Sequence, residues 1–294
     1  EDQGLSALLF HYGRYLLISA SRPGTQAANL QGIWNKEMIP PWFCDYTINI
    51  NTQMNYWPAG PCNLDEMTEP LMRMCREMAA DGERTAKAYF GCDGICGFHN
   101  TDIWRKTSPA DGRAMWSFWP MGYAWLCRNL YDQYLFSLDR EYLKELYPIL
   151  KENVHFSLQA MSKGERGYVL SPATSPENEF LQDGQAVSVA AYSENANAII
   201  RNLFRDYLEC CQELGISDEL TERVGEVLGQ MTPVAVDSKG RIMEWHEELE
   251  EADVRHRHLS HLYELHPGRG IGRKTPELLD AARKALESRG DEGT

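Results

Sequence analysis

The sequence has no long apolar run and no excess of basic residues. None of its apolar stretches approaches the ~20 residues that span a bilayer, which excludes a transmembrane protein. Its 29 basic residues are outnumbered by 43 acidic ones, and the formal net charge of −14 argues against binding to nucleic acid or to an anionic membrane. Apolar residues make up 43% and charged residues 24%, which excludes collagen, coiled-coil and disordered classes.

Paired cysteine motifs are also missing. The eight cysteines are scattered, and Cys92 and Cys96 form a lone pair with no second pair nearby. Cys75, Cys127 and Cys210 fall in apolar helical patterns, which predicts small buried thiols. The sequence begins without Met or a signal peptide and both ends look cut, so the compartment stays unknown.

Strand signals are few, and helical periodicity dominates. Residues 167–170 and 241–243 suggest short hairpin pieces, and no glycine-rich phosphate loop follows a strand. Apolar spacings of three and four predict roughly eight or nine helices. The expected segments with clear boundaries are residues 5–20, 63–80, 121–136, 139–158, 190–214, 218–228 and 275–288.

Three long loops separate these helices and hold most of the Trp, Asn and His residues. They cover residues 21–62, 91–119 and 164–189. Long loops inside a helical domain are usually functional. The pattern is typical of an α/α toroid, in which paired helices form the wall and the connecting loops form a cleft at one end.

Amide side chains alternate with apolar ones in residues 47–58. Asn49 and Asn51 lead this series, and Trp57 follows them. An aromatic ring beside amides suits a sugar, because the ring stacks on the apolar sugar face while hydroxyls take hydrogen bonds. A solvated loop with a helix cap is the alternative.

A second polar stretch, residues 98–105, contains His99 and Trp104. Its side chains are mostly hydrogen bonders with fixed geometry, which indicates a binding loop. A helix-capping loop with a surface Trp is the alternative.

Glu177 follows Pro176 in the proline-framed segment 171–179. A proton donor to a leaving group must be held firmly, and a stiff loop over a cleft does this. A surface acid that caps a helix is the alternative.

Histidines and arginines alternate in residues 255–263. Three histidines at this spacing suggest a metal site, but the interleaved arginines disfavour a bound cation, so no metal is expected. The acidic run 244–253 is expected to pair with these arginines or to form a solvated face. Arg257 and His258 are instead expected to hydrogen-bond a polyhydroxylated ligand.

Taken together, these motifs resemble one family. In their order along the chain they are residues 14–19, 21–35, 46–59, 99–105, 175–179 and 256–263. The chain resembles the catalytic domain of glycoside hydrolase family 95, whose main activity is inverting α-L-fucosidase, chiefly on α-1,2-linked L-fucose. The resemblance implies an all-α (α/α)6 barrel without cofactor or metal and a fucosylated oligosaccharide or glycan as substrate.

The resemblance also implies roles for individual residues. Glu177 matches the general acid, and Asn49 and Asn51 match the asparagines that hold the attacking water. Arg257, His258 and His99 match substrate-binding positions.

We also expect Trp57 and Trp104 in the sugar site. Inversion requires the acid and the base to stand roughly 6.5–9.5 Å apart, with the water between them.

Part of the family pattern is missing. Family enzymes carry a β-sandwich before the barrel and further helices after it, so residues 1–294 are expected to form one partial barrel domain, incomplete at its C-terminal end. The aspartate that completes the base lies in a motif resembling Phe-Gln-Ile-Asp-Gly-Asn, which this sequence does not contain. Little or no turnover is therefore expected from these residues alone.

Three other functions compete with this prediction. An α-L-galactosidase would use the same scaffold, because L-galactose differs from L-fucose by one hydroxyl at C6. A non-catalytic sugar-binding remnant would bind without forming product. A metal-dependent α/α toroid cyclase would need a metal and would be sensitive to chelators.

Overall fold

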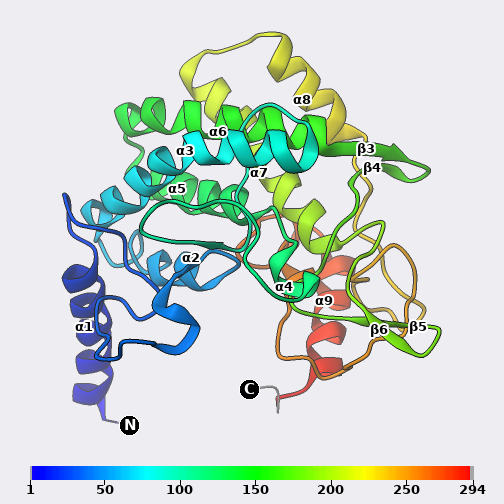
Figure 1. Ribbon diagram of the computed structural model, residues 1–294, viewed down its shortest axis with the longest axis horizontal. Helices are drawn as coiled ribbons and strands as arrows, with labels where there is room; N and C mark the ends of the chain where they lie inside the picture. The colour runs from blue at the N-terminus through cyan, green and yellow to red at the C-terminus, as the bar shows by residue number, and fades with distance from the viewer. Residues whose placement is uncertain (1, 292–294) are drawn as a thin grey trace. The chain divides into compact units, whose positions relative to one another are not determined.

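The computed structural model describes residues 2–291, which are mainly helical (Figure 1). Its α-helices are α1 (Gln3–Ala20), α2 (Asn51–Tyr56), α3 (Glu69–Phe90), α4 (Ala114–Ser117), α5 (Gly122–Ser137), α6 (Arg140–Ala160), α7 (Glu194–Leu214), α8 (Glu219–Gly229) and α9 (Pro276–Arg289). Short 3-10 helices cover η1 (Pro41–Cys44), η2 (Asp65–Thr68) and η3 (Ser260–Leu262). The predicted all-α class is confirmed.

The strands form three separate antiparallel ribbons of two strands each. They are β1 (Tyr46–Thr47) with β2 (Asn100–Thr101), β3 (Met161–Gly164) with β4 (Gly167–Leu170), and β5 (Phe180–Gln182) with β6 (Gln185–Val187). The predicted strand at 167–170 is confirmed as β4. Residues 241–243 pair with residues 235–237 as the predicted hairpin piece, through an antiparallel bridge between Ile242 and Val236 and a hydrogen bond of 2.9 Å from the Met243 N–H to the Ala235 carbonyl.

The chain folds into two compact units. Among the described residues, the first comprises 2–108 and 122–153, and the second comprises 109–121 and 154–291. The last of the three points at which the chain changes unit falls within α6, where the sequence has no linker.

Helices α3 and α5 build the core of the first unit. Both contribute fully buried apolar side chains, including Met74 and Met78 of α3 and Leu126 of α5. The Tyr123 hydroxyl of α5 donates a hydrogen bond of 3.0 Å to the Cys75 carbonyl of α3. Burial raises the pKa of the Cys75 thiol to about 12, so this cysteine is an inert core residue, as predicted.

The beginning of α3 differs from the prediction. Asn63 does not cap the helix, because it adopts a left-handed φ of 54° and a 3-10 turn precedes α3. Pro70 in the first turn favours a start at Glu69, because proline needs no N–H partner there. The helix then runs past the predicted end at Ala80 to Phe90, and Gly91 ends it with a φ of 67°.

Helices α7 and α8 lie side by side in the second unit, joined by the short link 215–218 (Figure 1). Asp218 caps α8 as predicted and forms a reciprocal capping box with Thr221. Helix α7 begins at Glu194, later than the predicted Ala190, because Ala190 pairs with Ala173 in an isolated bridge. This bridge closes the segment that carries Glu177.

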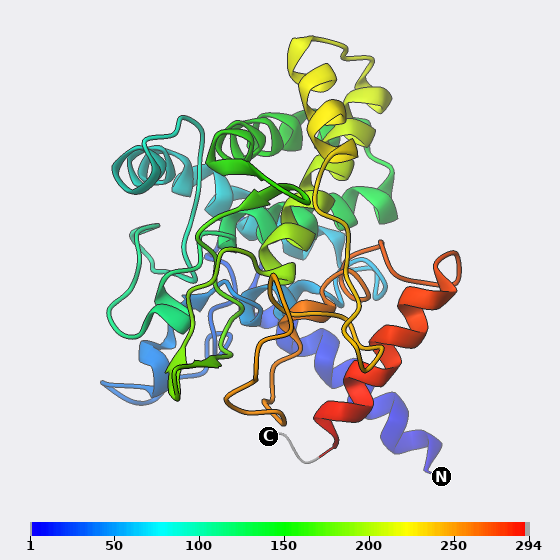
Figure 2. The same ribbon diagram turned by 90° about the vertical axis from the view of Figure 1, so that its right-hand side faces the viewer.

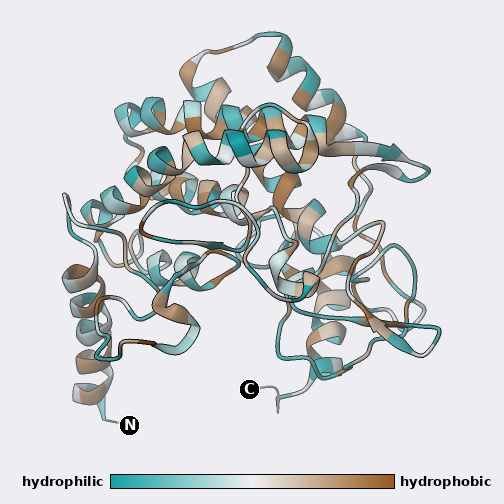
Figure 3. Ribbon diagram, viewed as in Figure 1, coloured by the Kyte–Doolittle hydropathy of each residue, from teal (hydrophilic) through white to brown (hydrophobic). Residues whose placement is uncertain are grey.

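The apolar residues of α1 remain largely exposed among the described residues. The helix itself is confirmed, and apolar positions recur along it (Figure 3). Leu8 and Leu9 are nevertheless 64% and 69% exposed, and only Leu17 and Ala20 of this helix are buried. None of the helices in residues 2–291 is both long and apolar enough to cross a membrane.

Candidate functional site

In the first unit, a backbone contact brings the segment of His99 next to the segment of Asn49 and Asn51. The β1–β2 ribbon continues in a hydrogen bond of 2.7 Å from the Ile48 N–H to the His99 carbonyl. Asn49 follows this bond directly, and Asn51 is the first residue of α2. Both asparagines are half-buried, and His99 is only 7% exposed. The ribbon therefore brings the backbone of His99 next to the turn that carries Asn49 and Asn51.

Buried contacts hold this turn against α5. The Gln53 side-chain amide donates to the Ile48 carbonyl at 2.6 Å, and the Asn129 amide of α5 donates to the Gln53 carbonyl at 2.9 Å. Gly122 begins α5 where a Cβ atom would lie 2.6 Å from both the Ile48 side chain and the Phe98 carbonyl. Glycine there permits the close approach that sets the position of Asn49.

The two predicted sugar-stacking tryptophans have different environments. Trp57 caps the C-terminal end of α2 and is half-buried. Trp104 is 86% exposed, in a loop whose backbone is held by its N–H bond of 2.8 Å to the Asp102 carboxylate. The adjacent Arg105 is buried and donates to Glu77 at 2.7 Å. The loop is thus anchored while the Trp104 ring faces solvent, and a sugar-binding role for either ring stays a prediction.

The second unit brings Glu177, Arg257 and His258 together. The Arg257 guanidinium donates to the Glu177 carboxylate at 3.2 Å, and the His258 Nε2 lies 3.6 Å from the same oxygen. The Glu177 side chain is 23% exposed and that of Arg257 is 49% exposed. A carboxyl group that is partly sheltered yet open on one side is suited to exchange a proton with a bound ligand.

The backbone around Glu177 is fixed on both sides. The Ser175 hydroxyl donates to the Glu244 carboxylate at 2.6 Å, and the Asn178 amide donates to it at 3.1 Å. The Ser260 hydroxyl hydrogen-bonds the Pro176 carbonyl. Each residue that neighbours Glu177 therefore has a partner from the segment 244–260.

A buried asparagine and tryptophan secure Ser260 in turn. The Asn195 amide of α7 donates to the Ser260 carbonyl at 2.9 Å, and the Trp119 indole donates to Asn195 at 2.8 Å. Trp119 is fully buried. It is a structural anchor here, not a surface ring.

Arg257 pairs with Glu177 and not with the acidic run 244–253. Four acids of this run, Glu247, Glu248, Glu250 and Asp253, are exposed, which agrees with the alternative prediction of a solvated face. Glu244 is buried and accepts from Arg289 of α9 at 2.7 Å, while Glu251 pairs with Arg289 and Arg241. Figure 2 shows α9 beside the segment that carries these acids. The burial of Glu244 is not predictable from the sequence, because an acid in a charged run carries no local sign of burial.

The three histidines of the segment 255–263 point to different partners. The His256 and His258 rings lie 5.2 Å apart, and the backbone N–H of His258 donates to His256 Nδ1 at 3.1 Å. His261 is buried, with Nδ1 lying 3.5 Å from Glu244. Within residues 2–291, no group of three His, Cys, Asp or Glu side chains is placed to hold a metal ion.

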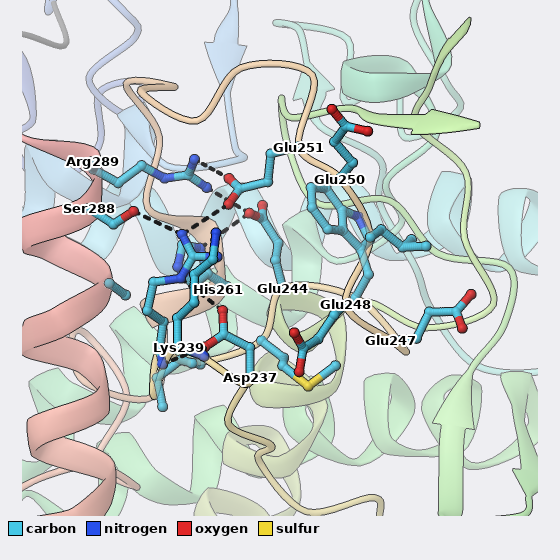
Figure 4. Close-up of a pocket in the computed structure, with 16 residues that line it drawn as sticks. Asp237, Lys239, Glu244, Glu247, Glu248, Glu250, Glu251, His261, Ser288 and Arg289 are labelled. Carbon is cyan, nitrogen blue, oxygen red and sulfur yellow. Dashed lines mark hydrogen bonds and ion pairs between the residues drawn. The ribbon is translucent and has the colours of Figure 1, made fainter. Parts of the chain in front are cut away.

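A cavity of about 290 Å³ adjoins this network (Figure 4). Glu244, His261 and Arg289 line it together with acidic side chains of the run 244–253. Glu177, Arg257 and His258 are not among its lining residues. The cavity is therefore separate from the predicted acid.

His261 makes the stability of the protein depend on pH. Burial, with Arg289 nearby, lowers its pKa from 6.5 to about 3. The unfolded chain binds an extra proton between these values, so the stability from neutral His261 is complete above about pH 6.5 and is lost as the pH falls. His261→Gln should remove a slope of about 1.4 kcal/mol per pH unit between about pH 6.5 and 4.5.

Urea unfolding of both proteins across this pH range measures that slope. Other groups titrate equally in the two proteins, so the difference between their unfolding free energies isolates His261. An identical pH dependence would show that His261 is protonated in the folded state.

A carboxyl group framed by a rigid loop beside an arginine and a histidine, on a helical scaffold, fits the catalytic domain of a glycoside hydrolase. The chain belongs to glycosyl hydrolase family 95, because the profile of this family's catalytic domain matches residues 1–294. The predicted family is confirmed, and the helical class of the chain agrees with the α/α toroid expected for it.

Two curated relatives support the assignment. The chain is 43% identical over 298 residues to "Alpha-L-fucosidase 2" of Arabidopsis thaliana, covering 100% of this chain and 35% of that protein. It is 32% identical over 301 residues to "Probable alpha-fucosidase A" of Aspergillus niger, covering 98% of this chain and 37% of that protein. The chain thus spans about a third of the length of these relatives.

Proposed function

We propose that the protein carrying this chain is a glycoside hydrolase that removes terminal L-fucose, chiefly α-1,2-linked, from oligosaccharides or glycans with inversion. The observation that carries the proposal is the cluster of Glu177, Arg257 and His258 in a chain of this family. In this cluster Glu177 lies on a loop that is hydrogen-bonded on both sides of it. The names of the two relatives support fucose as the sugar.

Glu177 would act as the general acid that protonates the glycosidic oxygen. Its ion pair with Arg257 requires the ionised carboxylate, whereas proton donation requires the neutral acid. The exposed Arg257 would therefore leave Glu177 on ligand binding and donate to a sugar hydroxyl. His258, which lies against the same carboxylate oxygen, would also donate to the substrate.

Asn49 and Asn51 would orient the attacking water through their carbonyl oxygens. An amide is a poor base, so a carboxylate must take the proton from the water. By the resemblance, this carboxylate would belong to the motif resembling Phe-Gln-Ile-Asp-Gly-Asn, which these residues do not contain. His99, Trp57 and Trp104 would contribute to sugar binding.

Two alternatives predict different products. An α-L-galactosidase would prefer the glycoside with the additional C6 hydroxyl, and the preference would be strong if the pocket hydrogen-bonds that group. A sugar-binding remnant would bind the fucosylated ligand without hydrolysing it.

The test is a nuclear magnetic resonance time course with the complete gene product and an α-1,2-fucosylated oligosaccharide. Initial release of β-L-fucose supports inversion, whereas initial release of α-L-fucose contradicts it. Faster cleavage of the matched L-galactoside would favour the galactosidase. Fucose binding by calorimetry without product would favour the remnant.

A further inference from the structure

Glu244 contacts three parts of the second unit, two through its carboxylate and one through its backbone carbonyl. Its Oε1 accepts from the Ser175 hydroxyl at 2.6 Å, and its Oε2 accepts from the Asn178 amide at 3.1 Å and from Arg289 at 2.7 Å. Its backbone carbonyl also accepts from the Glu194 N–H of α7 at 3.0 Å. Glu244 therefore joins the loop of Glu177 to helices α7 and α9.

Burial makes this carboxylate a strong acceptor. Glu244 is 7% exposed, and Figure 4 shows Arg289 directed at the Glu244 carboxylate. Hydrogen bonds to an ionised group are roughly twice as strong as neutral ones. His261 has a pKa lowered to about 3 and supplies no charge near neutral pH, so Arg289 provides the compensating cation.

The two loop contacts lie on either side of the proposed acid. Ser175 is two residues before Glu177, and Asn178 directly follows it. The Asn178 N–H also donates to the Ser175 carbonyl at 2.8 Å, which closes a tight turn around Glu177. Moving or removing the Glu244 carboxylate would release both ends of this turn.

We infer that Glu244 is a positioning residue for Glu177: it holds Ser175 and Asn178 and so directs the acid at the glycosidic oxygen. The inference rests on the proposed function, because it needs Glu177 to be the proton donor. A displacement of about 1 Å can lower a rate about 10²-fold when it misaligns a catalytic group. Sugar affinity should change little, because Glu244 is buried away from solvent.

The test compares two leaving groups in the complete gene product. The leaving oxygen of a fucosylated oligosaccharide must be protonated. In α-L-fucosyl fluoride the leaving group is fluoride, which departs with little help from an acid. Glu244→Ala should lower kcat about 10²-fold on the oligosaccharide, with a similar KM and a much smaller loss on the fluoride. Glu244→Gln, which keeps an acceptor oxygen, should restore part of the lost rate.

Glu251→Ala is the matched control. Glu251 also pairs with Arg289 but, among residues 2–291, has no hydrogen bond to the 175–178 turn, so its loss should affect both substrates equally. Equal losses on both substrates for Glu244→Ala and Glu244→Gln would overturn the inference, since a lower folded fraction affects every substrate alike. Unchanged kcat in both variants would also overturn it.

The parent enzyme and Glu177→Gln separate this inference from the proposed function. No fucose release by the parent enzyme would overturn the proposed function. Suppose that Glu177→Gln loses more activity on the oligosaccharide than on the fluoride, but neither Glu244 variant does. That result would overturn only the role of Glu244.

Discussion

Glu177→Gln in the complete gene product is expected to lower kcat for fucosylated oligosaccharides by about 10²- to 10⁴-fold. Glutamine has nearly the same shape and keeps an acceptor oxygen for Arg257, which lies 3.2 Å from the native carboxylate. It has no acidic proton to give to the leaving oxygen. Sugar affinity should therefore stay close to that of the parent enzyme.

The measurement is kcat and KM on an oligosaccharide and on α-L-fucosyl fluoride, with sugar affinity from calorimetry. Glu179→Gln is the control, because Glu179 lies in the same loop but pairs with the exposed Arg113. The control should lose little activity and show no difference between leaving groups. Near-normal oligosaccharide turnover in Glu177→Gln would refute the assignment of Glu177 as the acid.

Arg201→Met is expected to destabilise the protein by about 3–5 kcal/mol, because it leaves two buried carboxylates without their shared cation. Arg201 of α7 pairs with Glu194 at 3.2 Å and with Glu264 at 2.6 Å. Both carboxylate side chains are 1% exposed. Arg201 also donates to the Thr232 carbonyl at 3.0 Å, so its loss frees a further buried acceptor.

Arg205→Met provides the matched comparison on the same helix. Arg205 also pairs with Glu264, at 3.2 Å, but its side chain is 36% exposed. Solvent screens such a pair, and its loss should cost about 1 kcal/mol or less. The difference between the unfolding free energies of the two variants thus compares the loss of a buried arginine with the loss of a partly exposed one.

Urea unfolding at neutral pH, followed by tryptophan fluorescence, measures both variants. The buried Trp119 is a suitable reporter, because its indole donates to Asn195 at the start of α7. The loss of unfolding free energy in Arg201→Met should become smaller at acidic pH, because protonation neutralises Glu194, whose cation the substitution removes, whereas Glu264 still pairs with Arg205. Equal losses for Arg201→Met and Arg205→Met would contradict the inferred role of the buried network.

Much of the helical framework was predictable from local patterns. The predicted helices at 5–20, 121–136 and 139–158 lie within one or two residues of α1, α5 and α6. Apolar spacing and capping residues act over a few positions, so they are visible in a linear sequence. The motifs around Asn49, Glu177 and Arg257 were equally local, and they sufficed to identify the family.

Helix boundaries that depend on distant partners were not predictable, and neither were very short strands. Helix α7 begins late because Ala190 pairs with Ala173. The β5–β6 ribbon was not predicted, although its strands pair with each other, because each has only three residues and no strong alternation. Short strands of this kind carry too little periodicity to separate them from a loop.

The sequence by itself determined the helical class, the family and the loop residues expected to bind sugar. Only the tertiary structure decided which charges are buried together. Glu244 pairs with Arg289, 45 positions away, and also binds Ser175, 69 positions away. Desolvation makes such contacts strong, and it depends on the packing of distant segments, which no local spacing of residues encodes.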